Sequence, residues 1–155
     1  MLFRSVTLSS SLPPRVVLLV GLPGSGKSTW AAQQGLPTLS TDAIRVMLAD
    51  DVTNQTIHAR VFATVRYLLK QRLALNRPVT CVDATHITPW ERRPYLSLPD
   101  CRIEAVYFDT PLAVCQARNL QRERVVPAAV IARMAARLVK PTKAEGFSRV
   151  RVVRA

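Results

Sequence analysis

The stretch GLPGSGKSTW, residues 21–30, restricts the possible folds of this chain more than any other feature. It contains the pattern G-x-x-x-x-G-K-[ST], from Gly21 to Ser28, and three of the five glycines of the chain lie within it. The apolar run RVVLLV, residues 15–20, precedes it and has the composition of a strand buried on both faces. A helix is expected at 27–34, with Gly35 as its stop. A strand, a glycine-rich loop and a helix in this order predict a phosphate-binding loop.

Each residue type in this loop has a physical reason to be there. Glycines let the backbone amides turn inward around a phosphate, and the following helix adds the positive end of its dipole. Lys27 is expected to reach the β- and γ-phosphates of a nucleotide, and the Ser28 hydroxyl is expected to bind Mg²⁺. We therefore expect ATP and Mg²⁺ as cofactors. The residues expected to bind ATP in this loop are Gly21, Gly24, Ser25, Gly26, Lys27, Ser28 and Thr29.

Strand-like and helix-like segments alternate along the rest of the chain. Further strands are predicted at 37–40, 78–83, 102–108 and 147–154, and further helices at 42–48, 54–75, 89–96, 111–121 and 127–138. The segment 54–75 has apolar residues at helical spacing and is expected to be the longest helix. This alternation predicts an α/β fold of the P-loop NTPase class: a five-stranded parallel sheet sandwiched between helices, with the ligand beyond the carboxyl ends of the strands. Residues 1–14 are predicted to be a disordered leader and 15–155 a single domain.

The composition favours a folded protein with a polyanionic partner. Hydrophobic residues make up 48% of the 155 residues, and the formal net charge is +12, most of it from arginine. The segment 118–154 holds ten basic residues and two acids, which suits a nucleic-acid backbone, although aromatic residues for base stacking are scattered. The three cysteines have neither zinc-binding nor disulfide-type spacing, and no apolar run is long enough to span a membrane. A cytoplasmic protein without a membrane partner is expected.

Asp42 and Arg45 are candidates for contacting a second substrate. Asp42 follows the second predicted strand, so it should lie at the same edge of the sheet as the glycine-rich loop. Arg45 comes three residues later and shares its helix face. A carboxylate can orient an acceptor hydroxyl, and a guanidinium can hold a neighbouring phosphate. The competing interpretation is that Asp42, or Ser40 or Thr41, caps the helix and that Arg45 lies on a solvated face.

Asp83 and three arginines complete the candidate set. Asp83 ends the apolar strand VTCVD, the position of a carboxylate that binds Mg²⁺ directly or through water; the alternative is a turn cap. Arg118, Arg122 and Arg124 lie at the end of a predicted helix and in the segment after it. Such a segment could close over ATP as a lid and neutralise charge on a transferring phosphoryl group, or it could be a solvated basic helix end. His86, alone in a turn, is expected to be structural.

Together these motifs resemble the P-loop 5′-hydroxyl polynucleotide kinases, above all the kinase domain of bacterial polynucleotide kinase-phosphatases, among the AAA_33-type and zeta-toxin-like P-loop kinases. The resemblance runs from about residue 16 to residue 153 and rests on GLPGSGKST, STDAIR, LADDVTNQTIHARVF, VDATH, CQARNLQRER and EGF, which follow the order of the family. It implies that residues 15–155 form a P-loop kinase domain that transfers the γ-phosphoryl group of ATP to a 5′-hydroxyl of RNA or DNA.

The resemblance also implies a role for each matching residue. Asp42 would contact the attacking hydroxyl as general base, and Arg45 would hold a phosphate of the acceptor. One departure is His86, which stands where the family usually has Asn. The implied catalytic residues are Lys27, Asp42, Arg118 and Arg124, the metal site is formed by Ser28 and Asp83, and Arg122 contacts ATP.

Two other functions fit parts of the pattern. A small-molecule kinase or zeta-toxin-like phosphotransferase would use the same loop, Asp42 and lid, whereas Arg45 and the basic C-terminal third favour a polynucleotide acceptor. A non-kinase ATPase or ATP-binding module ranks behind both, because the chain has little room for the extra helical domain that a remodelling ATPase needs. The chain holds no Asp-x-Asp phosphatase signature and no nucleotidyl-transfer lysine motif, so phosphatase or ligase activities are expected in separate partners.

Overall fold

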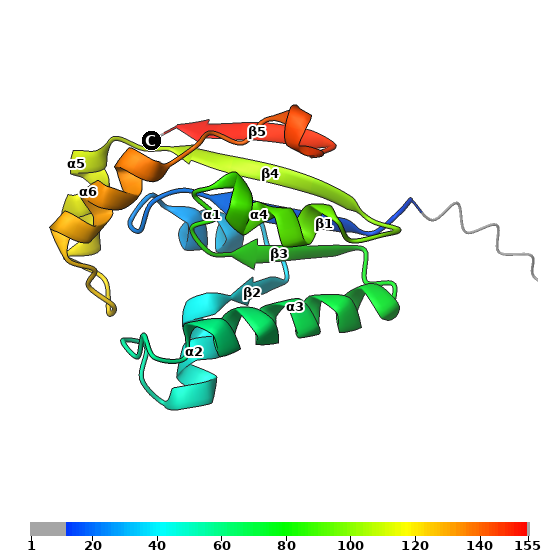
Figure 1. Ribbon diagram of the computed structural model, residues 1–155, viewed down its shortest axis with the longest axis horizontal. Coiled ribbons are helices and arrows are strands. Elements are labelled where there is room, and N and C mark those ends of the chain that lie inside the picture. Colours follow the sequence, from blue (N-terminus) through cyan, green and yellow to red (C-terminus); the bar gives the residue numbers. More distant parts are fainter. Residues whose placement is uncertain (1–11, 155) are drawn as a thin grey trace, which may run out of the picture.

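The computed structural model describes residues 12–154, which form an α/β domain around one sheet. The five strands are parallel and lie in the order β2-β3-β1-β4-β5, so β1 is central, between β3 and β4 (Figure 1). The predicted five-stranded parallel sheet is confirmed. The strand bounds are Arg15–Val20 (β1), Thr38–Ser40 (β2), Val79–Asp83 (β3), Arg102–Asp109 (β4) and Arg149–Arg154 (β5).

Six α-helices connect the strands within residues 12–154, as the alternating pattern predicts. A single 3₁₀ turn, η1 at Lys143–Glu145, precedes β5. The helix bounds are Lys27–Gln33 (α1), Thr41–Ala49 (α2), His58–Ala74 (α3), Pro89–Leu96 (α4), Leu112–Asn119 (α5) and Ala128–Arg137 (α6).

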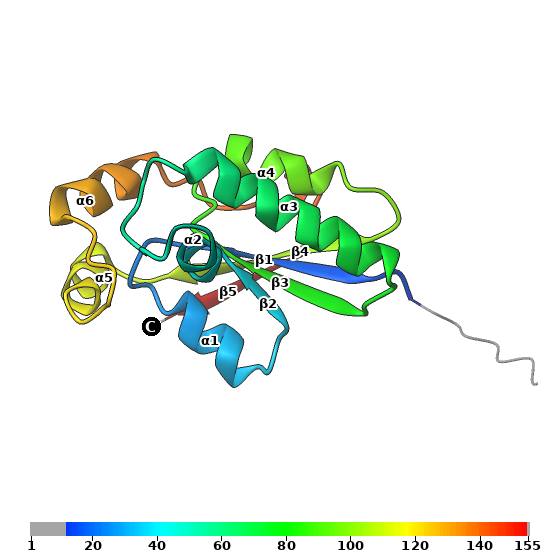
Figure 2. The ribbon, with the colours of Figure 1, turned by 90° about the horizontal axis from the view of Figure 1, so that it is seen from below.

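Alternate residues of the central strand β1 divide the core into two layers. Val16 and Leu18 pack on the face covered by α3 and α4, where Tyr95 belongs to the same cluster. Val17 and Leu19 belong to the cluster on the opposite face, next to α1. Figure 2 shows α3 and α4 on one side of the sheet and α1 on the other. Because both faces are covered, β1 is apolar at five successive positions, which explains the continuous run VVLLV.

Helices α5 and α6 lie beyond the carboxyl ends of the strands, at one end of the molecule (Figures 1 and 2). A separate apolar cluster holds them there, formed by Leu22 of the glycine-rich loop, Cys115 of α5 and Ile131 of α6. The loop after β1 and the two terminal helices are therefore packed as one unit, on the side of the sheet where ligands bind in this fold class.

The longest helix begins later than its apolar spacing predicts. α3 starts at His58 and not near Asn54, because residues 51–57 form turns held by their own polar side chains. The Asn54 side-chain oxygen accepts hydrogen bonds from the backbone N–H of Thr56 at 2.9 Å and from the Thr56 hydroxyl at 2.6 Å. Such local side-chain hydrogen bonds compete with helix formation. The predicted longest helix is confirmed, with its first turn replaced by a loop.

The predicted leader lies largely outside the described residues. Within them, the Pro14 carbonyl accepts a hydrogen bond from the Arg102 backbone N–H at 2.8 Å, which ties the start of β1 to β4. Cys81 and Cys115 are buried free thiols and belong to two of the apolar clusters. None of the helices among residues 12–154 combines the length and the apolar character that a membrane span requires.

Candidate active site

The glycine-rich loop between β1 and α1 adopts a conformation that only glycine tolerates at two positions. Gly24 and Gly26 have φ angles of 81° and 98°, in the left-handed region. A Cβ atom at Gly24 would also lie 2.4 Å from the carbonyl oxygen of Cys115, so the loop backbone packs directly on α5. Gly21 closes the loop differently, because its N–H donates to the Thr85 carbonyl at 3.0 Å. The Ser25 hydroxyl is buried without a hydrogen-bond partner among the described residues.

Lys27 is buried at the start of α1. Its Nζ donates hydrogen bonds to the backbone carbonyls of Gly21 at 3.0 Å and Leu22 at 2.8 Å, within the same loop. Burial lowers the pKa of Lys27 from 10.5 to about 8, and the charge of Asp83 opposes this shift. An anion bound at the loop, in addition to Asp83, would raise the pKa of Lys27 and keep its ammonium group charged. A lysine that binds phosphate needs this charge.

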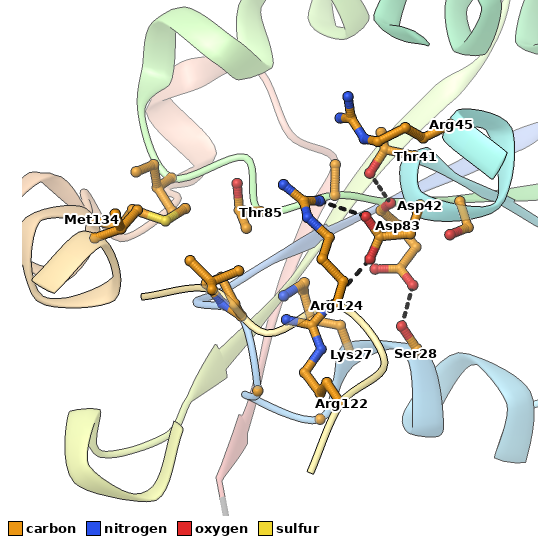
Figure 3. A pocket seen from close by; sticks show the side chains of 18 of the residues that line it. Lys27, Ser28, Thr41, Asp42, Arg45, Asp83, Thr85, Arg122, Arg124 and Met134 are labelled. Carbon is orange, nitrogen blue, oxygen red and sulfur yellow. Dashed lines mark hydrogen bonds and ion pairs between the residues drawn. The ribbon is translucent and has the colours of Figure 1, made fainter. Parts of the chain in front are cut away.

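Ser28 and Asp83 meet across the carboxyl ends of β1 and β3. The Ser28 hydroxyl donates a hydrogen bond to Asp83 Oδ2 at 2.5 Å, and Asp83 is the last residue of β3 (Figure 3). The Thr41 hydroxyl donates to the Asp83 backbone carbonyl at 3.3 Å, which links α2 to the same point. A hydroxyl and a carboxylate in direct contact are hard oxygen ligands of the kind that Mg²⁺ prefers. Both predicted metal ligands therefore lie together, beside the loop. Thr29, the residue after Ser28, lines a cavity next to the glycine-rich loop.

Asp42 is in direct contact with two of the predicted lid arginines. It lies in the first turn of α2, whose N-cap is Ser40: the Ser40 hydroxyl oxygen accepts from the Ala43 N–H at 3.3 Å. Asp42 is therefore not the cap. Its carboxylate accepts hydrogen bonds from Arg124 at 2.6 Å and Arg122 at 3.2 Å, in two ion pairs that join α2 to the segment after α5 (Figure 3). The predicted base and two predicted lid residues are in direct contact.

Arg45 is buried, so its predicted alternative on a solvated face is wrong. Its relative exposure is 1%, and its Nη1 donates a hydrogen bond to the Asn54 carbonyl at 2.8 Å. The Arg45 Nε has no hydrogen-bond partner among the described residues, although the side chain lines the same cavity as Asp42. Burial, and then the nearby charge of Arg124, lower the pKa of Arg45, while Asp42 opposes the shift. A guanidinium in this position gains stability from an added anion.

Two of the predicted lid arginines, Arg118 and Arg122, also lie near the glycine-rich loop or act on it through their charge. Nη1 of Arg118 would be 3.7 Å from a Cβ atom placed on Gly26. The Nη1 of Arg122 is buried without a hydrogen-bond partner among residues 12–154. The positive charge of Arg122 also contributes to the lowered pKa of Lys27. Arg122 thus pairs with Asp42, acts through its charge on Lys27, and has one nitrogen without a hydrogen-bond partner.

These residues line one cavity of about 650 Å³ between the glycine-rich loop, α2, the start of α3, the lid segment and α6 (Figure 3). Its lining contains six lysine and arginine side chains but only three carboxylates, so it suits an anionic ligand. One wall of this cavity was not predicted from the sequence. These residues are Gln55, His58, Phe62, Val130, Met134 and Arg137. They lie in the segments 54–75 and 127–138, which the sequence predicts only as helices.

Asn119 is a further residue that the sequence analysis missed. Its side chain, 1% exposed, holds both backbone groups of Val126: Nδ2 donates to the Val126 carbonyl at 2.6 Å, and Oδ1 accepts from the Val126 N–H at 2.9 Å. One amide thus closes the loop 120–126, which carries Arg122 and Arg124. Asparagine at the end of a helix is ordinarily a local capping residue, so the sequence contains no signal for this longer contact.

His86 is structural, as expected for a lone histidine in a turn. It is buried under the sheet edge, with Nδ1 2.7 Å from the Leu19 carbonyl oxygen and a φ of 45°. Its ring packs edge-on against Tyr95, with 5.2 Å between ring centroids. It is not among the residues that line the 650 Å³ cavity.

Several solved structures share this fold. A chain in the structure of the Pnkp1/Rnl/Hen1 complex matches with a TM-score of 0.61 and 24% identity, over 74% of this chain and 40% of that one. This chain therefore spans well under half the length of that protein. A gluconokinase from Sinorhizobium meliloti 1021 matches with a TM-score of 0.56 and 20% identity, over 91% of this chain and 82% of that one.

A shikimate kinase from Acinetobacter baumannii, solved in complex with shikimate, matches with a TM-score of 0.53 and 19% identity, over 90% of this chain and 83% of that one. At identities this low, the likeness shows a shared P-loop kinase fold. No curated protein matches the chain. The family model described as an AAA domain, AAA_33, matches residues 16–141, a span that includes every candidate site residue. This chain therefore belongs to the AAA_33 family of AAA domains and has a P-loop kinase fold.

Proposed function

We propose that this protein transfers the γ-phosphoryl group of ATP to the 5′-hydroxyl of an RNA or DNA strand. The observation that carries the proposal is the position of Asp42, whose carboxylate lies in the same cavity as the glycine-rich loop and is ion-paired to Arg122 and Arg124. A kinase needs a carboxylate opposite the γ-phosphate to orient the attacking hydroxyl. Asp42 follows β2 at the carboxyl edge of the sheet, the edge where the loop also lies.

The residues on the donor side fit ATP and Mg²⁺. The left-handed glycines of the loop leave space for a phosphate chain against the backbone, and the buried Lys27 ammonium lies among them. Ser28 and Asp83 would hold the metal ion, whose contribution is to neutralise charge on the β- and γ-phosphates. The open nitrogen of Arg122 would then have a phosphate oxygen as its partner.

On the acceptor side, each charged residue has a defined task. Asp42 accepts a hydrogen bond from the 5′-hydroxyl and takes its proton as the new O–P bond forms and the bond to the leaving ADP breaks. Arg122 and Arg124 leave Asp42 for the transferring phosphoryl group, where their charge stabilises the transition state. The Arg45 Nε, open in this structure, pairs with the phosphate on the 3′ side of the same nucleoside.

Charge favours a polynucleotide over a small neutral acceptor. With a sugar or another neutral alcohol, Asp42 would be the carboxylate that opposes the effects of burial and of Arg124, and these two effects together lower the pKa of Arg45. A phosphodiester supplies a further anion, and the net charge of +12 attracts a polyanion from a distance. The acceptor chemistry that fits this site is therefore a hydroxyl with a phosphate one nucleoside away.

The proposal is tested by labelling. Purified protein is incubated with Mg²⁺, ATP labelled at the γ-position and 5′-hydroxyl oligonucleotides, and, in parallel, with a pool of sugars and other small alcohols. We expect label on the oligonucleotide, a fall of about 100-fold or more for Asp42→Asn, and no change for the control Asp100→Asn, an exposed acid outside the cavity. Arg45→Gln should raise the KM for the oligonucleotide more than the KM for ATP.

Label on a small alcohol in place of the oligonucleotide would assign the protein to the small-molecule kinases. Nucleic-acid-stimulated hydrolysis of ATP without a phosphorylated strand would make it an ATPase. An equal rise in both KM values for Arg45→Gln would remove Arg45 from the acceptor site.

A further inference from the structure

A second cavity, of about 370 Å³, lies between the later turns of α3 and the end of α4. Arg66 and Lys70 of α3 line one side of it, and Pro94, Tyr95 and Ser97 line the other. None of these residues lines the 650 Å³ cavity of the candidate active site. No step of the proposed reaction uses this second cavity.

A row of side chains on α3 connects the two cavities. His58, Phe62, Arg66 and Lys70 are spaced four residues apart, so each lies next to the following one along the helix surface. The rings of His58 and Phe62 are in contact, with 4.7 Å between centroids, and both residues line the active-site cavity. Arg66 and Lys70 continue the row into the second cavity. At about 1.5 Å per residue, Arg66 lies about 12 Å along the helix from His58.

The second cavity has the polar groups of an anion site. Neither Arg66 nor Lys70 forms an ion pair or a hydrogen bond through its side chain with the rest of residues 12–154. Tyr95 is 2% exposed, and its hydroxyl is buried with no hydrogen-bond partner among the described residues. Burial raises the pKa of Tyr95 to about 12, while the charge of Arg66 opposes the rise. Two unpaired cations that line one cavity together with Tyr95 favour an anionic ligand.

We propose that the second cavity and the row on α3 form a track for the acceptor strand, in which Arg66 and Lys70 bind phosphates downstream of the reacting nucleotide. This inference rests on the proposed function, because it takes the strand to start at Asp42. A single strand carries one phosphate per about 3.4 Å when stacked, so about 12 Å corresponds to three or four nucleotides. The track therefore serves long acceptors: a mononucleotide or dinucleotide reaches the first cavity only.

The test separates binding from catalysis. Arg66→Gln/Lys70→Gln is compared with Arg60→Gln/Arg77→Gln, a charge-matched pair of exposed residues that line neither cavity. Binding of a fluorescent 5′-hydroxyl 8-mer is measured by anisotropy at several salt concentrations. Loss of two phosphate contacts should reduce the slope of log affinity against log salt by about 1.4, and affinity near 0.1 M salt should fall on the order of tenfold. The control pair should leave the slope unchanged.

Phosphoryl transfer supplies the second measurement. Arg66→Gln/Lys70→Gln should raise the KM for the 8-mer and leave unchanged the KM for a nucleoside 3′-phosphate. An unchanged salt slope, an equal rise in both KM values, or an equal effect of the control pair would overturn the track. If the 8-mer binds with the expected slopes and accepts no phosphate, the track stands and the kinase proposal falls. If the 8-mer accepts phosphate and the slope is unchanged, the kinase proposal stands and the track falls.

Discussion

The buried imidazole of His86 should make the stability of the protein fall in mild acid. His86 is 2% exposed, and burial lowers its pKa from 6.5 to about 4, against the opposing effect of its hydrogen bond to the Leu19 carbonyl. In the unfolded chain the imidazole binds a proton below about pH 6.5, whereas in the folded protein it stays neutral down to about pH 4. Between these values the unfolded state binds more protons, so stability decreases as the pH falls.

The size of the effect follows from the two pKa values. Once the pH is below both, the loss reaches about 3.4 kcal/mol, at about 1.36 kcal/mol per tenfold difference in proton affinity. Between pH 7 and pH 5, the same titration removes about 2 kcal/mol. That is a large part of the 5–15 kcal/mol typical of a domain of ordinary stability.

Urea unfolding at pH 7 and pH 5 measures this loss, with His86→Asn as the comparison. Asparagine does not titrate in this range and tolerates the φ of 45° found at this position. All other groups, including His58 and the carboxylates, titrate in both proteins, so the difference between the two pH dependences belongs to His86. We expect the natural protein to lose about 2 kcal/mol more than the variant. Equal losses would show that His86 is protonated as easily in the folded protein as in water.

Three further predictions follow from other contacts. Because Lys27 has a pKa of about 8, ATP affinity measured by calorimetry should fall up to tenfold per pH unit above that value, as the ammonium loses its proton; a flat profile to pH 9.5 would contradict this. Asn119→Ala should abolish hydrogen-exchange protection of the Val126 amide and slow phosphoryl transfer on the order of tenfold; a Val126 amide that stays protected would rule out the clamp. Arg92 is 0% exposed, and its guanidinium donates hydrogen bonds to both carboxylate oxygens of Glu145, at 2.9 and 3.0 Å. Arg92→Ala should therefore lower the free energy of unfolding by about 3 kcal/mol or more; a loss below about 1 kcal/mol would place the Arg92–Glu145 pair among weak surface ion pairs.

The order of strands and helices could be predicted because each buried strand has a distinctive composition. RVVLLV and VTCVD are apolar almost throughout, as required for strands covered on both faces, and their positions agree with β1 and β3. The start of α3 could not be predicted in this way. Apolar spacing continues to Ile57, but the choice between helix and turn at Asn54 depends on local side-chain hydrogen bonds that have no periodic pattern.

The candidate site was predictable where one residue type at one position has one chemical use. Lys27, Ser28 and Asp83 meet as expected, because a loop after β1 and the end of β3 must share one edge of a parallel sheet. The ion pairs of Asp42 with Arg122 and Arg124 were not predictable, since they depend on how the segment after α5 folds back over α2.

Several residues that line the cavity could not be predicted from the sequence either. Phe62 and Met134 look like ordinary apolar helix positions, and only the packing of α3 and α6 around the cavity distinguishes them. For Arg45, the spacing from Asp42 left open both a contact with a phosphate of the substrate and a position on a solvated face. Its burial depends on the turn at Asn54, whose carbonyl accepts its hydrogen bond.

The most direct test of the central claim is a crystal structure with a non-hydrolysable ATP analogue, Mg²⁺ and a 5′-hydroxyl oligonucleotide. We expect an Asp42 oxygen within hydrogen-bond distance of the 5′-oxygen, with the 5′-oxygen in line with the γ-phosphorus, and we expect Arg122 and Arg124 to have moved from Asp42 to the γ-phosphate. A structure in which the nucleotide fills the loop, both arginines remain on Asp42 and the 5′-hydroxyl lies elsewhere would contradict it.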